Sequence, residues 1–414
     1  MSWLIGRFIP AAWLAAFVAL AVVFGTPAPP PAAAFFSLAL VGLLYCSLAA
    51  GGELSGLLKR YSLIFSAALL LVACVTASEW LALGRDPPRL AQPIAAQLGM
   101  LLCLPPLALL LRDRARMRMV VAVFAALCLW HLATMPIEAV TGWSLNWHGA
   151  PALPRQLGPL NYQAAGLAWQ AYYFPGLFLP LFYLACGAIL ERQVWGRYAF
   201  NARNWLLASG LWLVPAVCVQ SRSALAGTLA AMLVGWVVQR KGRQPRLWFA
   251  AAAIALLGAL LFWYLFSQNK SGIGLRLAYL DLYVVESLRW PWILLGHGYA
   301  SFPDPQMQAP GLQFVHHSHN DFVQVLFSWG LPTLLAYLAF WFGLLKLVYT
   351  GFWRRGEYWP ALALVAVAPS FITDLGLNHY EKTAFLVLLA GFCLAFAQTE
   401  PRPDTAAATP LTPP

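Results

Sequence analysis

Three of the seven histidines stand close together as His316, His317 and His319, and Asn320 and Asp321 follow at once. A neutral imidazole has an unperturbed pKa of about 6.5, so a histidine can take a proton from a hydroxyl group near neutral pH. Histidine and aspartate are also common metal ligands. The cluster therefore predicts a general base or a metal site, and a surface cluster without a role is the third interpretation.

A metal site is the weaker of these interpretations. Metal ligands usually converge from one helix face or from separate loops, and this cluster offers no His-x3-His pair and no pair of carboxylates. The seven cysteines each fall within an apolar stretch, which favours packing residues over a zinc site or a disulfide framework. We therefore expect neither a metal nor another cofactor.

Two arginines, Arg222 and Arg276, are candidate ligands for a phosphate-bearing substrate, and Arg155 is a third arginine outside the predicted spans. Arg222 lies in a short polar turn between two apolar stretches. Arg276 begins a mostly apolar segment that predicts an interfacial helix, whose free backbone N–H groups favour an anion. Arg155 lies in a longer polar segment. The alternative interpretations are a snorkelling arginine, a lipid-headgroup contact and a solvated loop residue, respectively.

The composition indicates that membrane helices position these residues. Of the 414 residues, 61% are hydrophobic and 10% are charged, whereas a soluble domain has about 25% charged residues. In a bilayer, spanning helices of about 20 apolar residues satisfy their own backbone hydrogen bonds. The net charge of +11 comes from basic residues in short loops between apolar stretches, so we expect membrane lipids and no nucleic acid as partners.

The hydropathy pattern predicts an all-α polytopic membrane protein with about twelve transmembrane helices. Pro105 and Pro106 are expected to kink the fourth helix. We interpret the first helix as retained rather than as a cleaved signal peptide. The twelve predicted spans are 8–24, 35–51, 61–78, 94–111, 119–135, 172–190, 204–220, 223–239, 247–267, 322–349, 359–374 and 383–398.

The positions of the basic residues predict the orientation. With both termini in the cytoplasm, most of the 26 Lys and Arg residues fall in short cytoplasmic loops, as the positive-inside rule requires. The long loops 136–171 and 268–321 then lie outside, and all seven histidines lie in or next to outer segments. We expect a single transmembrane domain over 1–398 and a disordered cytoplasmic tail over 399–414.

The spacing around His319 matches a known signature. His319 and Asn320 are followed by nine residues, Gly330, two more residues and Thr333. This pattern resembles the signature of the O-antigen ligase and O-antigen polymerase superfamily, in which His and Asn, Ser or Gln precede nine residues, Gly, two residues and Gly, Thr or Tyr. Many members have glycine at the last position, where this sequence has Thr333.

Other elements of the family are matched in the same order. Arg222 in its outer turn looks like the family's first essential arginine, and Arg276, ahead of Gly296 and Gly298, looks like its second. The turn from Gly158 to Asn161 is similar to a Gly-x-x-Asn element of the first long loop, which also holds Arg155. The resemblance implies a GT-C-like arrangement with a large, partly helical periplasmic loop before the histidine signature.

The resemblance also implies the chemistry. Such enzymes transfer a glycan from undecaprenyl pyrophosphate at the periplasmic face of the bacterial inner membrane, and for a ligase the acceptor is a sugar hydroxyl of the lipid A core. His319 would be the base, Arg222 and Arg276 would bind the pyrophosphate, and His317 and Asn320 would orient the base or the acceptor. The resemblance implies a metal-independent transfer, in which direct attack on the anomeric carbon would invert its configuration. The sequence also lacks the Asp-x-Asp motif with which many glycosyltransferases hold a divalent ion.

Three functions other than that of a ligase are compatible with the sequence. An O-antigen polymerase would use the same donor and a second lipid-linked glycan as acceptor. A protein O-oligosaccharyltransferase would use a serine or threonine hydroxyl, and the Gly158–Asn161 element is compatible with it. A transporter of lipid-linked sugars is the least favoured, because charged residues are nearly absent from the middle of the predicted spans.

Overall fold

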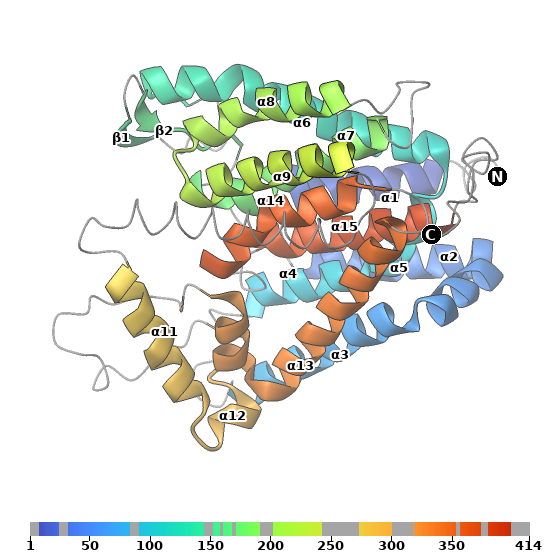
Figure 1. Cartoon of the computed structure of the whole chain (residues 1–414). Coiled ribbons are helices and arrows are strands. Elements are labelled where there is room, and N and C mark those ends of the chain that lie inside the picture. The colour runs from blue at the N-terminus through green and yellow to red at the C-terminus, as the bar shows by residue number, and fades with distance from the viewer. Residues whose placement is uncertain are drawn as a thin grey trace, which may run out of the picture.

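The computed structural model describes residues 8–24, 32–82, 91–144, 152–157, 160–167, 171–190, 202–241, 273–299, 318, 320–352, 357–373 and 380–398. Helices dominate this part of the chain, which also contains one short β-hairpin between α6 and η3 (Figure 1). The elements are α1 (Ile9–Val18), η2 (Ala19–Phe24), α2 (Ala32–Arg60), α3 (Ser62–Ala82), α4 (Ala91–Leu102), α5 (Leu104–Leu110), α6 (Arg114–Thr141), β1 (Leu153–Leu157), β2 (Leu160–Gln163), η3 (Ala171–Gly176), α7 (Phe178–Leu190), α8 (Ala202–Cys218), α9 (Arg222–Lys241), α11 (Ile273–Ser287), α12 (Trp292–Leu295), α13 (Asp321–Thr350), α14 (Trp359–Thr373) and α15 (Tyr380–Gln398).

The predicted spans coincide with helices, apart from 247–267, which lies outside the described residues together with the predicted tail 399–414. Four helices are long and apolar enough to cross a membrane, namely Ala33–Arg60, Ser62–Leu81, Arg114–Thr141 and Asp321–Thr350. Large apolar side chains on these helices are exposed, among them Leu48, Leu69 and Trp80. An outward apolar surface of this kind is what a lipid environment requires, so the all-α membrane class is confirmed, while the number of twelve crossings stays a prediction.

The fourth predicted span is divided, as the two prolines predicted. Helix α4 ends at Leu102, and α5 begins at Leu104 with proline in its first turn. Proline fits there because the first backbone N–H groups of a helix have no intrahelical acceptor. The first long loop is shorter than predicted, because α6 continues through Pro136 to Thr141 and ends at Gly142, whose φ is +74°.

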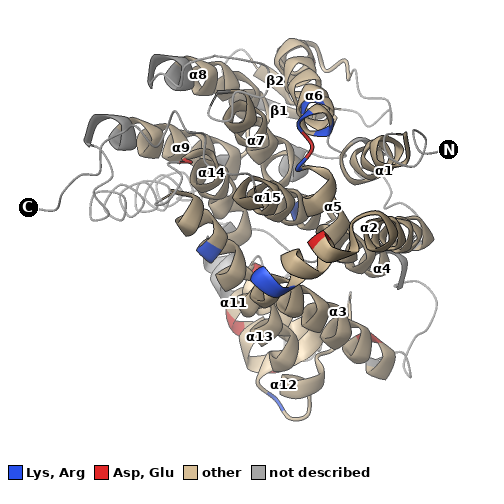
Figure 2. Ribbon diagram, turned by 90° about the vertical axis from the view of Figure 1, so that its right-hand side faces the viewer, with Lys and Arg blue, Asp and Glu red and all other residues tan. Residues whose placement is uncertain are grey.

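The two ends of the bundle differ. One end, which we call the hairpin end, carries β1 and β2, α11, α12 and the start of α13 (Figure 1). β1 and β2 pair antiparallel, with Leu153 opposite Gln163 and Leu157 opposite Leu160. The opposite end carries the basic turns, including Lys59 and Arg60 at the end of α2 and the arginines at the start of α6 (Figure 2).

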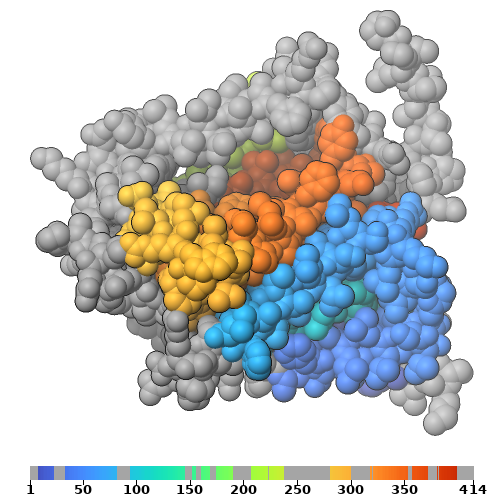
Figure 3. All heavy atoms as spheres, turned by 90° about the horizontal axis from the view of Figure 1, so that it is seen from below, coloured from blue at the N-terminus to red at the C-terminus, as the bar shows by residue number. Residues whose placement is uncertain are grey.

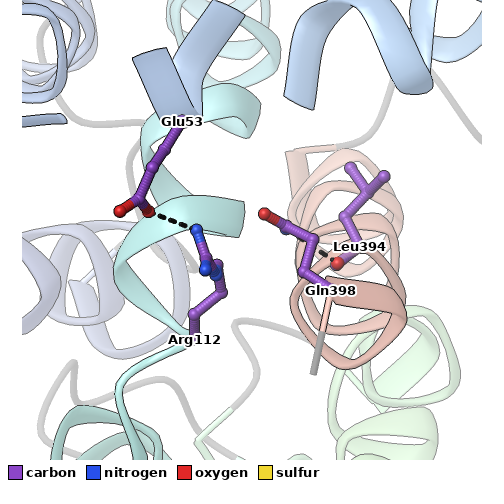
Figure 4. Close-up of polar contacts among 4 residues, drawn as sticks. All are labelled: Glu53, Arg112, Leu394 and Gln398. Carbon is purple, nitrogen blue, oxygen red and sulfur yellow. Dashed lines mark hydrogen bonds and ion pairs between the residues drawn. The ribbon is translucent and has the colours of Figure 1, made fainter. Parts of the chain in front are cut away.

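An ion pair ties two elements together at this opposite end. Arg112, between α5 and α6, binds the carboxylate of Glu53 on α2 (Figure 4). In the same view the Gln398 amide of α15 donates to the carbonyl oxygen of Leu394, 2.8 Å away. Both side chains of the ion pair are partly exposed, so the pair contributes about 0–1 kcal/mol to stability.

The predicted span 322–349 coincides with α13, but this helix is bent. The hydroxyl of Tyr337 donates a hydrogen bond to the carboxylate of Asp321, sixteen residues earlier. In a straight α-helix sixteen residues cover about 24 Å, so these side chains could not meet. The helix is interrupted at Gly330, where φ is +79° and ψ is 177°. Residues 321–329 therefore fold back against 331–350, and α13 consists of two segments.

Candidate functional site

The start of α13 holds the residues that flank His319. Asn320 is the N-cap, and its side-chain oxygen accepts the backbone N–H of Val323 at 3.1 Å. The hydroxyl of Ser318 donates to the Asn320 carbonyl at 2.8 Å and accepts the Asn320 N–H at 3.3 Å. The two residues that flank His319, Ser318 and Asn320, thus bond to each other at a capped helix start. His319 itself, His316 and His317 lie outside the described residues.

A buried amide connects this helix start to the rest of the segment 321–329. The side-chain oxygen of Gln324 accepts the backbone N–H of Ser318 at 2.9 Å, and its nitrogen donates to the Ser328 hydroxyl at 3.2 Å. All three residues are buried. An amide side chain can accept and donate at once, so a glutamine satisfies both partners without introducing a charge.

The break at Gly330 is covered by the turn Gly296–Gly298. In a continuous helix the carbonyl groups of Phe327 and Ser328 would accept from residues 331 and 332, but the helix is interrupted and residue 332 is a proline. The backbone N–H groups of His297 and Gly298 replace them, each at 2.8 Å. The turn that follows α12 is therefore joined to the helix that begins beside His319.

Helix α3 holds this junction from a third side. One carboxylate oxygen of Glu79 accepts the indole N–H of Trp329 at 2.6 Å and the backbone N–H of Tyr299 at 2.7 Å. The Ser78 hydroxyl donates to the Leu295 carbonyl. Figure 3 shows α11 and α12 in gold, α13 in orange and α3 in blue as neighbouring bands on one face of the molecule. The first segment of α13 is therefore fixed by side chains and backbone of two other elements.

Arg222 and Arg276 are placed by their helices. Arg222 is the first residue of α9 and follows Gln220, whose φ is +50°, and Arg276 lies in the first turn of α11. The starts of α9, α11 and α13 all lie at the hairpin end of the bundle (Figure 1). The structure thus brings the elements of the three predicted residues to one end, and their side chains lie outside the described set.

The β-hairpin lies beside the turn that carries Arg222. The side-chain amide of Gln220 donates to the Tyr162 carbonyl at 2.9 Å, and the Ala164 N–H donates to the Cys218 carbonyl at 3.0 Å. Asn161, an exposed residue of β2, is next to Tyr162, and Arg155 lies on β1. The predicted supporting residues Asn161 and Arg155 are therefore on a hairpin that is fastened to the start of α9.

Two polar side chains of α6 hold the segment that follows the hairpin. The carboxylate of Glu138 accepts the N–H groups of Ala165 and Gly166 at 3.2 and 3.1 Å. The ring of His131 lies 2.6 Å from the Leu127 carbonyl through Nδ1, and its Nε2 accepts the Leu167 N–H at 3.2 Å. A histidine with these two contacts is a neutral imidazole with its proton on Nδ1. His131 is thus a structural residue, although it is one of the histidines near the outer segments.

Removing the Glu138 carboxylate is expected to destabilise the protein. Glu138→Leu keeps a side chain of similar length but leaves two buried N–H groups without their acceptors, at about 1–3 kcal/mol each. Thermal unfolding of the detergent-solubilised protein should show a lower midpoint. Glu53→Gln, which breaks the exposed ion pair, is the matched control and should change stability by about 0–1 kcal/mol. Equal thermal unfolding midpoints for both variants would contradict a stabilising role of the Glu138 carboxylate.

The sequence did not point to Gln324, Glu79, Glu138 or His131 as site-supporting residues. Glu79, Glu138 and His131 bond to partners that are distant in the sequence, whereas Gln324 bonds to Ser318 and Ser328 around the start of its own helix. Their common signal is a polar residue inside an apolar stretch, which is costly unless it is hydrogen-bonded. Among the described residues there is no group of three or more His, Cys, Asp and Glu side chains that could hold a metal ion.

The described part of the chain is a mainly helical membrane protein, and the segments that bear the predicted site residues lie at its hairpin end. Residues 207–338, from α8 into α13, match the family model described as O-Antigen ligase. This match supports the resemblance of that region to the O-antigen ligase superfamily. The matched range contains Arg222, Arg276, His319, Gly330 and Thr333. A search of curated proteins finds no match.

Proposed function

We propose that the protein is an O-antigen ligase of the bacterial inner membrane, which transfers a glycan from undecaprenyl pyrophosphate to a sugar hydroxyl of the lipid A core. One observation carries the proposal. The starts of α9, α11 and α13, which bear Arg222 and Arg276 and directly follow His319, lie at one end of the bundle and all fall within the matched region (Figure 1). A base and two cations at one membrane face are what transfer from a lipid diphosphate needs.

The proposed reaction is a direct displacement. His319 accepts the proton of the acceptor hydroxyl, and the oxygen attacks the anomeric carbon of the donor sugar. The bond from that carbon to the pyrophosphate oxygen breaks, the configuration inverts, and both electrons of the broken bond leave with undecaprenyl pyrophosphate. Arg222 and Arg276 stabilise the added negative charge by charge-assisted hydrogen bonds, the role that a divalent ion has in other transferases. His317, Asn320, Arg155 and Asn161 are proposed supporting residues.

The charge distribution supports a periplasmic site. Basic residues at the end of α2 and the start of α6 lie at the end opposite the hairpin (Figure 2). Short loops rich in Lys and Arg remain in the cytoplasm. We therefore place this opposite end, with both termini, in the cytoplasm, and the hairpin end with the proposed site in the periplasm, where the lipid-linked glycan and lipid A core would meet.

Complementation in two strains tests the proposal. The wild-type gene is expected to restore capped lipopolysaccharide in a strain without its ligase, and to leave chain length uncorrected in a strain without its polymerase. Gels of lipopolysaccharide and of lipid-linked glycan measure both outcomes. The reverse result would identify a polymerase, and transfer of glycan to protein alone would identify an O-oligosaccharyltransferase.

Metal removal is expected to leave the reaction intact. Because two arginines neutralise the leaving group in the proposed site, purified protein treated with a divalent-ion chelator should transfer glycan at the rate of the untreated protein. Transfer is measured with isolated donor and acceptor lipids. A loss of rate on chelation that added Mg²⁺ reverses would refute the metal-independent mechanism.

A further inference from the structure

We infer that Gln324 is a positioning residue that sets the place of the catalytic base. The inference rests on the proposed function, because it assumes that His319 removes the proton of the acceptor. Gln324 lies in the first part of α13, one turn after Asn320, and is buried. It is not part of the signature formed by His319, Asn320, Gly330 and Thr333.

The oxygen of Gln324 fixes the backbone of Ser318, the residue immediately before the base. It accepts the backbone N–H of Ser318 at 2.9 Å, so the direction of the chain on entering His319 depends on this hydrogen bond. On the other side the Asn320 cap fixes the direction of the chain on leaving His319. The capping bond is local, whereas the Gln324 bond joins the loop to a side chain of the second helical turn. Gln324 therefore holds the loop against the body of the helix.

The nitrogen of Gln324 connects this loop to the turn at Gly296–Gly298. It donates to the Ser328 hydroxyl at 3.2 Å, and the Ser328 carbonyl accepts the Gly298 N–H at 2.8 Å. Hydrogen bonds thus connect Ser318 to Gln324, Gln324 to Ser328 and Ser328 to Gly298. The side chains of Ser318, Gln324 and Ser328 are buried. Since Ser328 is also next to Trp329, which donates to Glu79, Gln324 is anchored to a rigid junction.

The length of the side chain matters. One amide group must reach both the Ser318 peptide and the Ser328 hydroxyl, and neither asparagine, which is shorter by one methylene, nor an apolar residue can do so. A displacement of a catalytic group by about 1 Å can lower the rate by about 100-fold without any contact between the substituted residue and the substrate. The effect is expected on kcat, because Gln324 is proposed to act on the base and not on the cations that bind the donor.

Four variants of the full-length, detergent-purified protein test the inference with isolated donor and acceptor lipids. Gln324→Met removes both hydrogen bonds at similar volume and is expected to lower kcat by about 10- to 100-fold, with the donor KM within about two-fold of wild type. Gln324→Glu keeps an acceptor for Ser318 and an acceptor for the Ser328 hydroxyl, so its kcat should lie well above that of Gln324→Met. Ser328→Ala removes the acceptor for the Gln324 nitrogen but leaves the bond from Ser318 to the Gln324 oxygen, so it should give a smaller loss than Gln324→Met. Thr228→Val, which removes a buried hydroxyl bonded to Ala224 in α9, is the matched control and should keep wild-type kinetics.

These assays distinguish a failure of the proposed function from a failure of the positioning role of Gln324. If the wild-type protein does not transfer glycan, the proposed function fails. If it does and a folded Gln324→Met variant keeps wild-type kcat, the positioning role is refuted. A parallel rise in donor KM, with Gln324→Glu no better than Gln324→Met, would also refute it and indicate a general structural role. Should Gln324→Met not fold, a wild-type kcat in Ser328→Ala overturns the inference and a lower kcat with unchanged donor KM supports it.

Discussion

Replacing His319 with alanine is expected to abolish capping of lipopolysaccharide while lipid-linked O-antigen accumulates. Without the imidazole, the acceptor hydroxyl keeps its proton and is a poor nucleophile. General base catalysis contributes about 10²- to 10⁴-fold to a rate, so residual transfer should fall to 1% or less by this order of magnitude. The measurement is a gel of lipopolysaccharide, together with the lipid-linked fraction, from cells that depend on the variant.

The neighbouring histidine His316 is the matched control for this substitution. His316→Ala changes the same residue type in the same loop, and we expect normal capping because no role is assigned to it. Normal banding in His319→Ala would refute the assignment of the base. Single repeat units attached to the core, with loss of longer chains, would instead identify the reaction as polymerisation.

The helices could be predicted from the sequence because their signal is local. Long apolar runs form helices because a bilayer leaves the backbone no other hydrogen-bond partners. The prolines Pro105 and Pro136 differ in their effect on these helices. Pro105 falls in the first turn of a new helix and so divides α4 from α5. Pro136 lies inside α6, which continues to Thr141 because the surrounding structure tolerates one missing N–H.

The fold-back of α13 could not be predicted from hydropathy. Residues on both sides of Gly330 are apolar, so the sequence reads as one continuous span. The interruption depends on a glycine with positive φ and on replacement donors from His297 and Gly298, which are more than thirty residues away in the sequence. Only the fold brings those donors to the carbonyl groups of Phe327 and Ser328.

The sequence predicted the segments of the candidate site but not the residues that support them. The signature identified the chain segments, because residue type and spacing are properties of the sequence. It did not identify Glu79, whose partners are set by packing of α3 against α13 and the turn after α12, or Gln324, whose partners Ser318 and Ser328 depend on how the chain enters α13. The signature glycine Gly330 also acquires a structural reason: it allows the segment next to His319 to turn back over the second segment of α13.

Replacing Gly330 with alanine is expected to prevent that turn. Its φ of +79° with ψ of 177° is a conformation almost restricted to glycine, and other residues pay about 1–3 kcal/mol to adopt it. A Cβ atom at this position would also overlap the carbonyl group of Leu294. Backbone cannot give way as a flexible side chain can, so α12 must separate from α13 or the helix must straighten.

Either response would displace the catalytic loop. The bonds from His297 and Gly298 to α13, and the bond from Tyr337 to Asp321, require the present bend. We therefore expect Gly330→Ala to lose at least about 100-fold in transfer, as for a misplaced catalytic group, and to unfold at a lower temperature. Gly296→Ala should behave alike, because its Cβ would overlap the Ser328 carbonyl from the other side of the same contact.

Gly210→Ala in α8 separates this steric effect from a general intolerance of alanine. A Cβ there meets nothing within 4 Å, and alanine favours a helix over glycine by about 1 kcal/mol. This control should therefore keep wild-type capping and at least wild-type stability, measured by the same gel and by thermal unfolding. If Gly330→Ala matched it in both measurements, the bend at Gly330 would not be what holds the segment beside His319 in place. A loss confined to Gly330→Ala and Gly296→Ala would instead locate the requirement at the contact between the two glycines, where the signature helix and the turn after α12 meet.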